Sequence, residues 1–445
     1  MNINVYYVND KVKSLFTYRP IHLLKYYVSF PSDEGPIAYL SDEEHDRVIA
    51  FNPRDMRLLK VIKTAGSAPY PIDGAGPGHV YVSTRGSKSI DVISNKNLEI
   101  IRTISLSHHP RSVSYNKENG LALVSGRKTP VTSVIDTKTH QVVDTVGSDN
   151  ITSPTGYGGS LATGHPFWLS TTQFLILDRA NKKMDLYQLS ENLAKHTIRL
   201  VNSLKVNTSI HHVLSVPNGK DGTDVMKEKT DVFYAIGEGS SAEGLSPAVI
   251  AFELSDGNVV HKKTLHMPTD KVNVNEMGSH HANFHPDGIH IYLGSNEGYT
   301  YVINRNSMSI VKTIETGIGN GHTTMIPGKM LGISTNHDDT FFTIIDLNTH
   351  EKKAIIKLDG SASETAEKVN TRSFAKFGMQ ELIDLKSKRK TQGHTSSFDP
   401  MIDKYFYTSA SDAGRIIEID TEKLSISREI ELKCGSYPIQ GVFVW

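Results

Sequence analysis

Short apolar segments recur along the whole chain and are separated by turns rich in Gly, Asn, Asp and Ser. The stretch from His79 to Ile104 is typical: an apolar run, a polar turn at 85–88, a second apolar run, a turn at 94–97 and a further alternating segment. Short runs rich in β-branched residues and bounded by such turns favour strands over helices. The pattern therefore predicts a chain built mainly of short antiparallel strands.

The third run of each unit ends in a large apolar residue that a polar turn follows, and this residue marks eight units. The marks lie 42, 42, 52, 65, 51, 42 and 74 positions apart. A period near 42 with insertions is typical of β-propeller blades of four strands each. We predict an all-β fold, a single closed β-propeller with eight blades, or with seven if one unit is not a true blade. The marks are Phe51, Ile93, Ile135, Tyr187, Phe252, Ile303, Ile345 and Ile419.

The two ends of the repeat complement each other. The last strand, at 436–445, resembles the first strand of a unit, whereas the first unit begins with its second strand. We expect the C-terminal strand to complete and close the first blade, because closure removes exposed sheet edges. This divides the chain into an N-terminal arm at 1–34 and a propeller at 35–445. Insertions at 216–230 and 359–392 are expected to form surface loops, the second with a short helix.

Composition and charge narrow the function. The 445 residues include 48 Lys plus Arg and 48 Asp plus Glu, so no basic field for nucleic acid is expected. No apolar run approaches the roughly 20 residues of a transmembrane helix, and no membrane span is expected. A single cysteine, Cys434, excludes an internal disulfide and a thiolate cluster. Without a clear signal peptide, the expected location is periplasmic for a mature chain and cytoplasmic otherwise.

Histidine recurs at one position of the repeat. It precedes the mark of its unit by 22 residues in the fourth and sixth units, by 23 in the seventh and by 25 in the eighth. This position begins the innermost strand, so the imidazoles are predicted to converge at the mouth of the central channel. Convergent imidazoles bind metal ions. The predicted ligands are His109, His165, His281, His322 and His394, with His212 and His337 as further candidates.

Other histidines and charged residues have less support as ligands than this set. A single histidine near a strand start is usually a hydrogen-bonded structural residue, so the matched spacing carries the prediction. We expect His290 and His350 to be solvated, and the HPDG segment that begins at His285 is typical of a plain turn. The turns between second and third strands return to the channel mouth. Their charged residues include Arg85, Arg127, Lys128, Asp178 and Glu238.

The ligand type indicates the metal. Imidazole sites without thiolate suit copper or zinc, and clusters of many imidazoles suit copper. A zinc hydrolase needs only three protein ligands and an open position, which is fewer than this set offers. We therefore expect copper and redox chemistry on a small molecule, with two or three ions if the chain is the enzyme.

The units at 89–104, 131–146 and 299–314 resemble the YVTN class of propeller repeat, which is informative on fold and almost silent on function. The histidine pattern, an early His-His pair and then single histidines at later blade starts, is similar to the copper-binding propellers of nitrous oxide reductase and thiocyanate dehydrogenase. That resemblance implies a copper cluster at the channel mouth. It also implies a lysine, a glutamate and an aspartate near the metals, for which Lys128, Glu238 and Asp178 are the candidates by unit position.

The chain departs from these families in two ways. It lacks the second domain with paired cysteines of nitrous oxide reductase, which disfavours nitrous oxide reduction. It also has eight marks where those families have seven blades. An eight-bladed ring is similar instead to the haem d1 propellers, in which a channel histidine binds the haem iron.

The favoured hypothesis is a copper-dependent oxidoreductase that acts on a small sulfur- or nitrogen-containing anion such as thiocyanate. Glu238 or Asp178 would take the proton, and an external acceptor such as a c-type cytochrome would take the electrons. The alternatives are a non-catalytic propeller that carries a metal or a haem d1-type tetrapyrrole, and a protein-docking ring. A lactonase-type hydrolase is disfavoured because Asp, Glu and Asn do not dominate the channel position.

Overall fold

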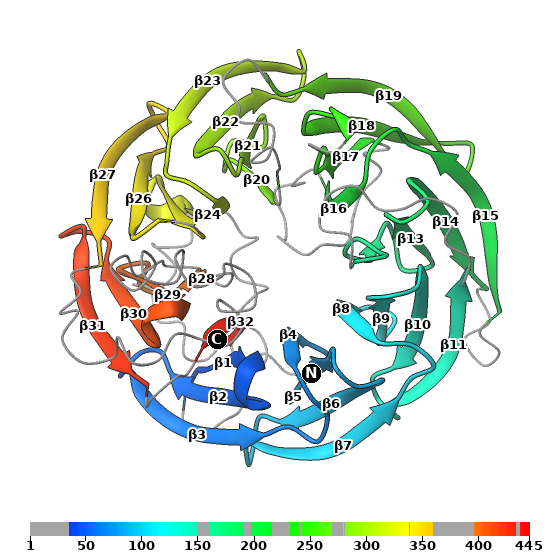
Figure 1. Ribbon diagram of the computed structural model, residues 1–445, viewed down its shortest axis with the longest axis horizontal. Helices are drawn as coiled ribbons and strands as arrows, with labels where there is room; N and C mark the ends of the chain where they lie inside the picture. Colours follow the sequence, from blue (N-terminus) through cyan, green and yellow to red (C-terminus); the bar gives the residue numbers. More distant parts are fainter. Residues whose placement is uncertain are drawn as a thin grey trace, which may run out of the picture.

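The computed structural model is a closed ring of eight four-stranded antiparallel sheets (Figure 1). The predicted eight-bladed all-β propeller is therefore confirmed over the seven-bladed alternative. The proposed arm at 1–34 and the insertions at 216–230 and 359–392 lie outside the described part of the chain. The structure describes residues 35–148, 161–190, 197–215, 232–240, 243–268, 279, 281–337, 339–358, 396–432 and 437–445.

The first four blades hold fifteen consecutive strands and the last strand of the chain. In order from the centre of the ring outward, blade 1 contains β32 (Pro438–Val444), β1 (Ile37–Asp42), β2 (Arg47–Asn52) and β3 (Arg57–Lys63). Blade 2 contains β4 (Pro69–Gly74), β5 (His79–Thr84), β6 (Ser89–Ser94) and β7 (Glu99–Ser105). Blade 3 contains β8 (Pro110–Asn116), β9 (Leu121–Gly126), β10 (Val131–Asp136) and β11 (Gln141–Gly147). Blade 4 contains β12 (Phe167–Trp168), β13 (Gln173–Asp178), β14 (Lys183–Leu189) and β15 (Ile198–Lys205).

The other four blades follow the same order from the centre outward. Blade 5 contains β16 (Ile210–Ser215), β17 (Val232–Gly237), β18 (Ala248–Ser255) and β19 (Asn258–His266). Blade 6 contains β20 (Ala282–Phe284), β21 (His290–Gly294), β22 (Tyr299–Asn304) and β23 (Ser309–Glu315). Blade 7 contains β24 (Asn320–Ile326), β25 (Leu331–Asn336), β26 (Phe341–Asp346) and β27 (Glu351–Lys357). Blade 8 contains β28 (Ser396–Phe398), β29 (Tyr405–Ala410), β30 (Arg415–Asp420) and β31 (Ser425–Glu431).

Burial explains the hydrophobic pattern of the strands. All six residues of β9 are buried, whereas β31 alternates between exposed and half-buried residues. Middle strands pack against a neighbouring blade on each face, so they appear in the sequence as continuous apolar runs. One such core joins Val48 of blade 1 to Val80 and Val82 of blade 2. Outer strands cover the core with one face only, and their sequences alternate.

The eight marks occupy one structural position. The pairing between the third and outer strands shifts register by a β-bulge in every blade, and the mark is the second residue of the shift, as at Val92/Ile93 and Ile344/Ile345. A bulge bends the strand and increases its twist, and a buried apolar side chain packs at that point. The same shift precedes Phe51, Ile135, Tyr187, Phe252, Ile303 and Ile419.

The C-terminal strand closes the ring as predicted. Strand β32 pairs with β1, where Ala38 faces Phe443. Close approach requires glycine at Gly441, because a Cβ there would lie 1.6 Å from the carbonyl oxygen of Tyr39. Trp445 Nε1 donates a hydrogen bond of 3.0 Å to Ser397 Oγ and so connects this strand to blade 8. Blade 1 is therefore connected to blade 8 by this hydrogen bond and to blade 2 by the shared hydrophobic core.

The loops divide between two faces of the ring. We call the upper face the one that carries the links between blades and the turns between second and third strands. The lower face carries the turns between first and second strands and between third and outer strands. Among the residues that the structure describes, the loops contain short 3-10 helices, namely η2 (Glu43–His45), η4 (Pro327–Lys329) and η5 (Ser411–Ala413). Within the described ranges, no helix has the length and apolar character needed to cross a membrane.

Candidate metal centre

Three histidines converge near the centre of the upper face. His165 precedes β12, His211 lies in β16 and His281 directly precedes β20. One nitrogen of each ring lies within 4.8 Å of the other two, and the ring centroids are 5.0, 5.5 and 4.8 Å apart. Rings that share a tetrahedral metal ion lie about 5 Å apart, because the metal–nitrogen bond is about 2.1 Å. We call these residues the central trio, and their geometry fits one metal ion.

Glycine before a histidine has a packing role at this face. A Cβ at Gly164 would lie 2.6 Å from the carbonyl oxygen of His211, the residue whose carbonyl accepts the backbone N–H of His165 at 2.8 Å. A Cβ at Gly321 would lie 2.1 Å from Nε2 of His337. Glycine therefore lets adjacent segments approach closely enough for their imidazoles to meet at the two Gly-His pairs that the structure describes.

Glu238 orients one member of the central trio. Its Oε1 lies 2.5 Å from Nδ1 of His211, and its Oε2 accepts a hydrogen bond from Arg179. The carboxylate therefore holds the proton on Nδ1, which leaves the Nε2 lone pair of His211 facing Nε2 of His281 at 3.3 Å. A carboxylate behind a histidine in this way is typical of metal sites, because it fixes the tautomer and makes the ring a better ligand.

Burial lowers the pKa of His165 and of His281 well below the ordinary value for histidine. Desolvation is the main cause, because it disfavours the charged imidazolium. The positive charge of Arg111 adds to the effect on His165, and His322 adds to the effect on His281. Both rings are therefore neutral at pH 7, the form that binds metal.

Three further predicted ligands surround the central trio. His322 stacks on His281 with centroids 3.9 Å apart and an interplanar angle of 28°. The imidazole of His322 therefore lies directly beside the central trio. His337 lies beyond it, with centroids 5.9 Å apart. His212 stacks on His281 at a centroid distance of 4.6 Å, and its Nε2 accepts the backbone N–H of Ala282 at 3.2 Å.

The remaining predicted residues make other contacts. Nδ1 of His109 lies 3.1 Å from the carbonyl oxygen of Arg85. Lys128 is exposed. Asp178 is buried, which raises its pKa, but its carboxylate accepts the backbone N–H and the side-chain amide of Asn181 at 2.9 and 2.8 Å and so closes its own turn.

The predicted ligands differ from the described site at two histidines. His394 lies outside the described residues. His211 is not among the predicted ligands, because its neighbour His212 is the histidine predicted to begin the fifth unit. The register of β16 shifts between Ile210 and His212, and the residue within such a bulge has its side chain redirected. The His-His pair at the start of an inner strand is the one signal in the sequence for His211.

Buried arginines lie next to the central trio. Arg85, Arg111 and Arg179 are 8%, 2% and 1% exposed. Arg111 donates to the carbonyl oxygen of Thr163, and its second terminal nitrogen lies 3.4 Å from Nδ1 of His211. Burial and the nearby charge of Arg179 lower the pKa of Arg111. With Glu238 paired to Arg179, the surroundings of the trio keep an excess of positive charge.

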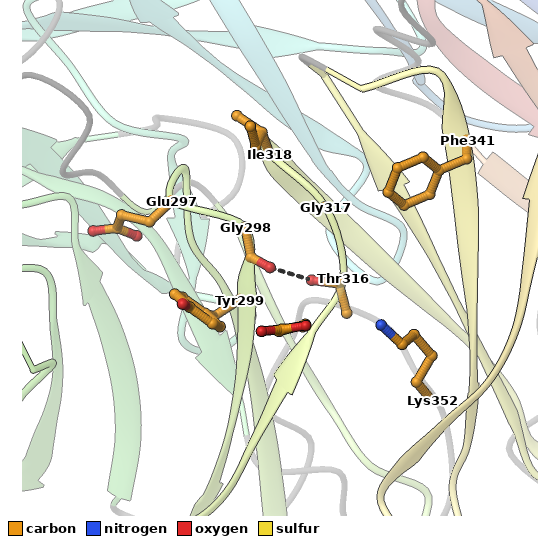
Figure 2. Close-up of a pocket in the computed structure, with 9 residues that line it drawn as sticks. Glu297, Gly298, Tyr299, Thr316, Gly317, Ile318, Phe341 and Lys352 are labelled. Carbon is orange, nitrogen blue, oxygen red and sulfur yellow. Dashed lines mark hydrogen bonds between the residues drawn. The ribbon is translucent and has the colours of Figure 1, made fainter. Parts of the chain in front are cut away.

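Two surface pockets lie apart from this centre. One, of about 250 Å³, lies at blades 6 and 7, where Thr316 Oγ1 donates to the carbonyl oxygen of Gly298 (Figure 2). The other, of about 330 Å³, lies at blades 4 and 5 beside Phe252 and His261. Neither pocket is lined by a member of the central trio.

Solved structures share the propeller fold at low sequence identity. Dihydro-heme d1 dehydrogenase NirN in complex with DHE is 12% identical, with a TM-score of 0.61 over 93% of this chain and 75% of that chain. AztD from Citrobacter koseri is 10% identical, with a TM-score of 0.55 over 90% and 96% of the two chains. A putative 6-phosphogluconolactonase from Bacteroides fragilis is 16% identical, with a TM-score of 0.53 over 74% and 98%. No protein-family model matches the chain, and no curated protein matches its sequence.

Proposed function

We propose that this propeller is a copper-dependent oxidoreductase that acts on a small anion at the centre of its upper face. The observation that carries the proposal is the convergence of His165, His211 and His281, with the tautomer of His211 set by Glu238. Imidazole ligands without thiolate suit copper. Three protein ligands also leave a position for substrate, as in catalytic metal sites. Bound copper would supply Lewis acidity and accept electrons from the substrate.

More than one copper ion is part of this proposal. The stack of His322 on His281 places a fourth imidazole 3.9 Å from the third. That offset is suited to an adjacent ion rather than to the same one. His337 and His394 are the next candidate ligands for it, which supports the expectation of two or three ions.

The substrate class follows from the charge around the central trio. Arg111 is buried, and its Nε has no hydrogen-bond partner among the described residues. A buried guanidinium beside neutral imidazoles favours an anion in the space between them, since the anion would satisfy the donor and offset the charge. Thiocyanate has the size, charge and soft sulfur atom that suit such a site. Its electrons would pass to an external acceptor such as a c-type cytochrome.

Glu238 takes a positioning role in this proposal rather than that of the proton acceptor. Both of its oxygens are engaged, one by His211 and one by Arg179. A carboxylate held in this way directs the ligand nitrogen and stabilises its N–H. The role of Asp178 as the proton acceptor and that of Lys128 as a catalytic residue near the metals stay predictions.

A second candidate is a carrier of a haem d1-type tetrapyrrole. It is favoured by the eight blades and by the buried arginines, which are suited to bind tetrapyrrole carboxylates. NirN, whose structure is in complex with DHE, shares the fold. One of the histidines of the trio would then bind the haem iron.

The deciding experiment measures which group the protein takes up. Chain purified without metal affinity steps is titrated with Cu²⁺ and, separately, with haem d1, and is assayed for thiocyanate-dependent reduction of cytochrome c. We expect two or three tightly bound copper ions and a turnover that needs them. Haem d1 uptake without copper binding would replace the oxidoreductase by the carrier. Uptake of neither would leave the protein-docking ring.

A further inference from the structure

A second group of histidines lies on the lower face, opposite the central trio. His285 and Asp287 lie in the turn between β20 and β21, His290 begins β21, and His350 lies in the turn between β26 and β27 of the next blade. The sequence-based expectation that His290 and His350 are simply solvated is wrong, because both are half-buried and in contact with each other. We call these four residues the lower-face cluster.

The ring positions fit one metal ion. The ring centroids are 5.9 Å apart for His285 and His290, 5.4 Å for His285 and His350, and 4.8 Å for His290 and His350. These separations agree with the spacing of about 5 Å that a shared tetrahedral ion imposes. A ligand oxygen of Asp287 lies within 4.8 Å of the ligand nitrogens of His285 and His290.

Asp287 divides its two oxygens between the turn and the rings. Oδ1 accepts the backbone N–H groups of Ile289 and His290 at 2.7 and 3.0 Å. Oδ2 instead lies 2.7 Å from Nδ1 of His290 and 3.0 Å from Nδ1 of His285. The turn therefore needs one oxygen only, and the other faces two imidazole nitrogens.

Hydrogen bonds outside the cluster orient two of its rings. Nε2 of His285 lies 3.0 Å from the carbonyl oxygen of Leu347, so it carries the proton and leaves the Nδ1 lone pair towards Asp287. That lone pair receives the backbone N–H of Asp287 at 3.2 Å, a long bond that an ion would replace. Nδ1 of His350 lies 2.5 Å from the hydroxyl of Tyr292, and its ring contacts those of His285 and His290. Carbonyl and hydroxyl partners of this kind are typical of the surroundings of metal ligands.

Blades 2 and 3 supply an internal comparison. His79 begins β5 as His290 begins β21, and Tyr81 Oη lies 2.9 Å from Nδ1 of His140, the counterpart of His350. The rings of His79 and His140 are 4.7 Å apart. The turn before β5, at 75–78, has the sequence Ala-Gly-Pro-Gly and supplies neither a histidine nor a carboxylate. The His–Tyr–His packing therefore recurs, while His285 and Asp287 are additions at blades 6 and 7.

We propose that His285, Asp287 and His290 bind one divalent ion, with the adjacent imidazole of His350 as the fourth ligand, and zinc is suited by ligand type and number. Three imidazoles and one carboxylate complete a tetrahedral set, so the site would be closed and structural. It would join the lower edges of blades 6 and 7. The proposal rests on contacts of the lower face and is independent of the function proposed for the upper face.

The test measures Zn²⁺ binding to the full chain in which His165→Ala and His281→Ala remove the central trio. We expect one bound zinc per chain by equilibrium dialysis. Asp287→Asn, which keeps the turn, and His290→Ala should each weaken binding at least 10- to 100-fold. The matched control His79→Ala should bind zinc as its parent does.

Circular dichroism and the Tm distinguish the loss of a zinc ligand from a failure to fold. Circular dichroism of each metal-free variant shows whether it is folded, and the single variant His165→Ala replaces the double variant if that one does not fold. Zinc should raise the Tm of the parent and not that of Asp287→Asn. Equal zinc affinity in folded Asp287→Asn, His290→Ala and His79→Ala would overturn the proposal, as would the absence of bound zinc from the folded parent. Copper binding by wild type is a separate measurement, so the two proposals fail independently.

Discussion

The central trio and the lower-face cluster are assembled from the same residue type in opposite ways. The trio takes one histidine from each of three consecutive blades, at residues 165, 211 and 281, and is surrounded by buried arginines. Three of the four lower-face ligands come from a single turn at 285–290. The first site depends on the relative placement of whole blades, whereas the second depends mainly on one hairpin. We therefore expect the central trio to be an open, charged site suited to chemistry and the lower-face cluster to be a closed site that contributes to stability.

The largest expected effect comes from opening the ring. Deletion of residues 437–445 exposes an edge of β1 and removes the contact between Trp445 and blade 8. We expect a loss of several kcal/mol in unfolding free energy, and copper binding should fall more than zinc binding because blade placement is disturbed. Thermal and urea unfolding, with both metal titrations, measure this. Unfolding like that of wild type would show that the closure does not hold the ring together.

A single residue refines the same test. Gly441→Ala places a Cβ against the Tyr39 carbonyl and should destabilise the closure strongly. The neighbouring substitution Gln440→Ala leaves the backbone contact intact and should change the Tm little. Equal effects from the two would mean that the close approach of β32 and β1 is unimportant.

The next largest effect separates the two sites by their ligands. His165→Ala and His281→Ala should each lower copper affinity at least 100-fold, since each removes one of three ligands from the central trio. Zinc binding at the lower-face cluster should be unchanged. Isothermal titration with each metal checks this, with the exposed His261 as the control substitution. Copper retained by both variants would contradict the central trio as the copper site.

Glu238→Gln distinguishes a positioning residue from a proton acceptor. If Glu238 acts through His211, the variant should bind copper about 10- to 100-fold more weakly, because the amide no longer fixes the tautomer. If Glu238 were the general base, copper would be retained and turnover alone would fall by about 10²–10⁴-fold. We expect the first result, measured as copper affinity and turnover on the same samples.

The smallest effect is a pH dependence of the metal-free protein. The pKa values of His165 and His281 are lower in the folded protein than the unfolded value of about 6.5, so the unfolded chain binds more protons below that pH. Stability is therefore full above about pH 6.5 and falls as the pH drops towards the folded pKa values, by up to about 1.4 kcal/mol per pH unit for each group. Urea unfolding at pH 7.5, 6.0 and 5.0 should show a shallower decline for His165→Gln than for wild type. Parallel declines would show that His165 does not contribute to the pH dependence.

The fold was predictable from sequence because its repeat is visible at single residues. The marks such as Ile93 and Ile345 are conspicuous because a bulge in each blade demands a large buried side chain at one position. Closure by 438–444 was also predictable, since an incomplete first unit and a surplus strand must be reconciled. Both inferences concern patterns that the backbone imposes on every blade.

The sites were less predictable because they depend on contacts between blades. Spacing pointed to His165 and His281, and the structure brings their rings together with that of His211. The sequence offered His212 in place of His211, because the register shift at the start of β16 cannot be read from it. The charge and position of Glu238 were visible, while its engagement by His211 and Arg179 was not. The lower-face cluster was hidden in an ordinary turn. Its one signal was the spacing of 60 residues from His290 to His350, close to the 61 from His79 to His140.

Closure by the last strand also determines when blade 1 can fold during synthesis of the chain on the ribosome. Ser41 Oγ donates to the carbonyl oxygen of Gln440, a contact across 399 positions, so β1 waits for its partner until nearly the whole chain has emerged. Blades 2 to 8 are each made of four consecutive strands and need no such partner, so they can form earlier, in order from the N-terminal side. Until release, the open edge of β1 is the part of the nascent ring most exposed to pairing with another chain.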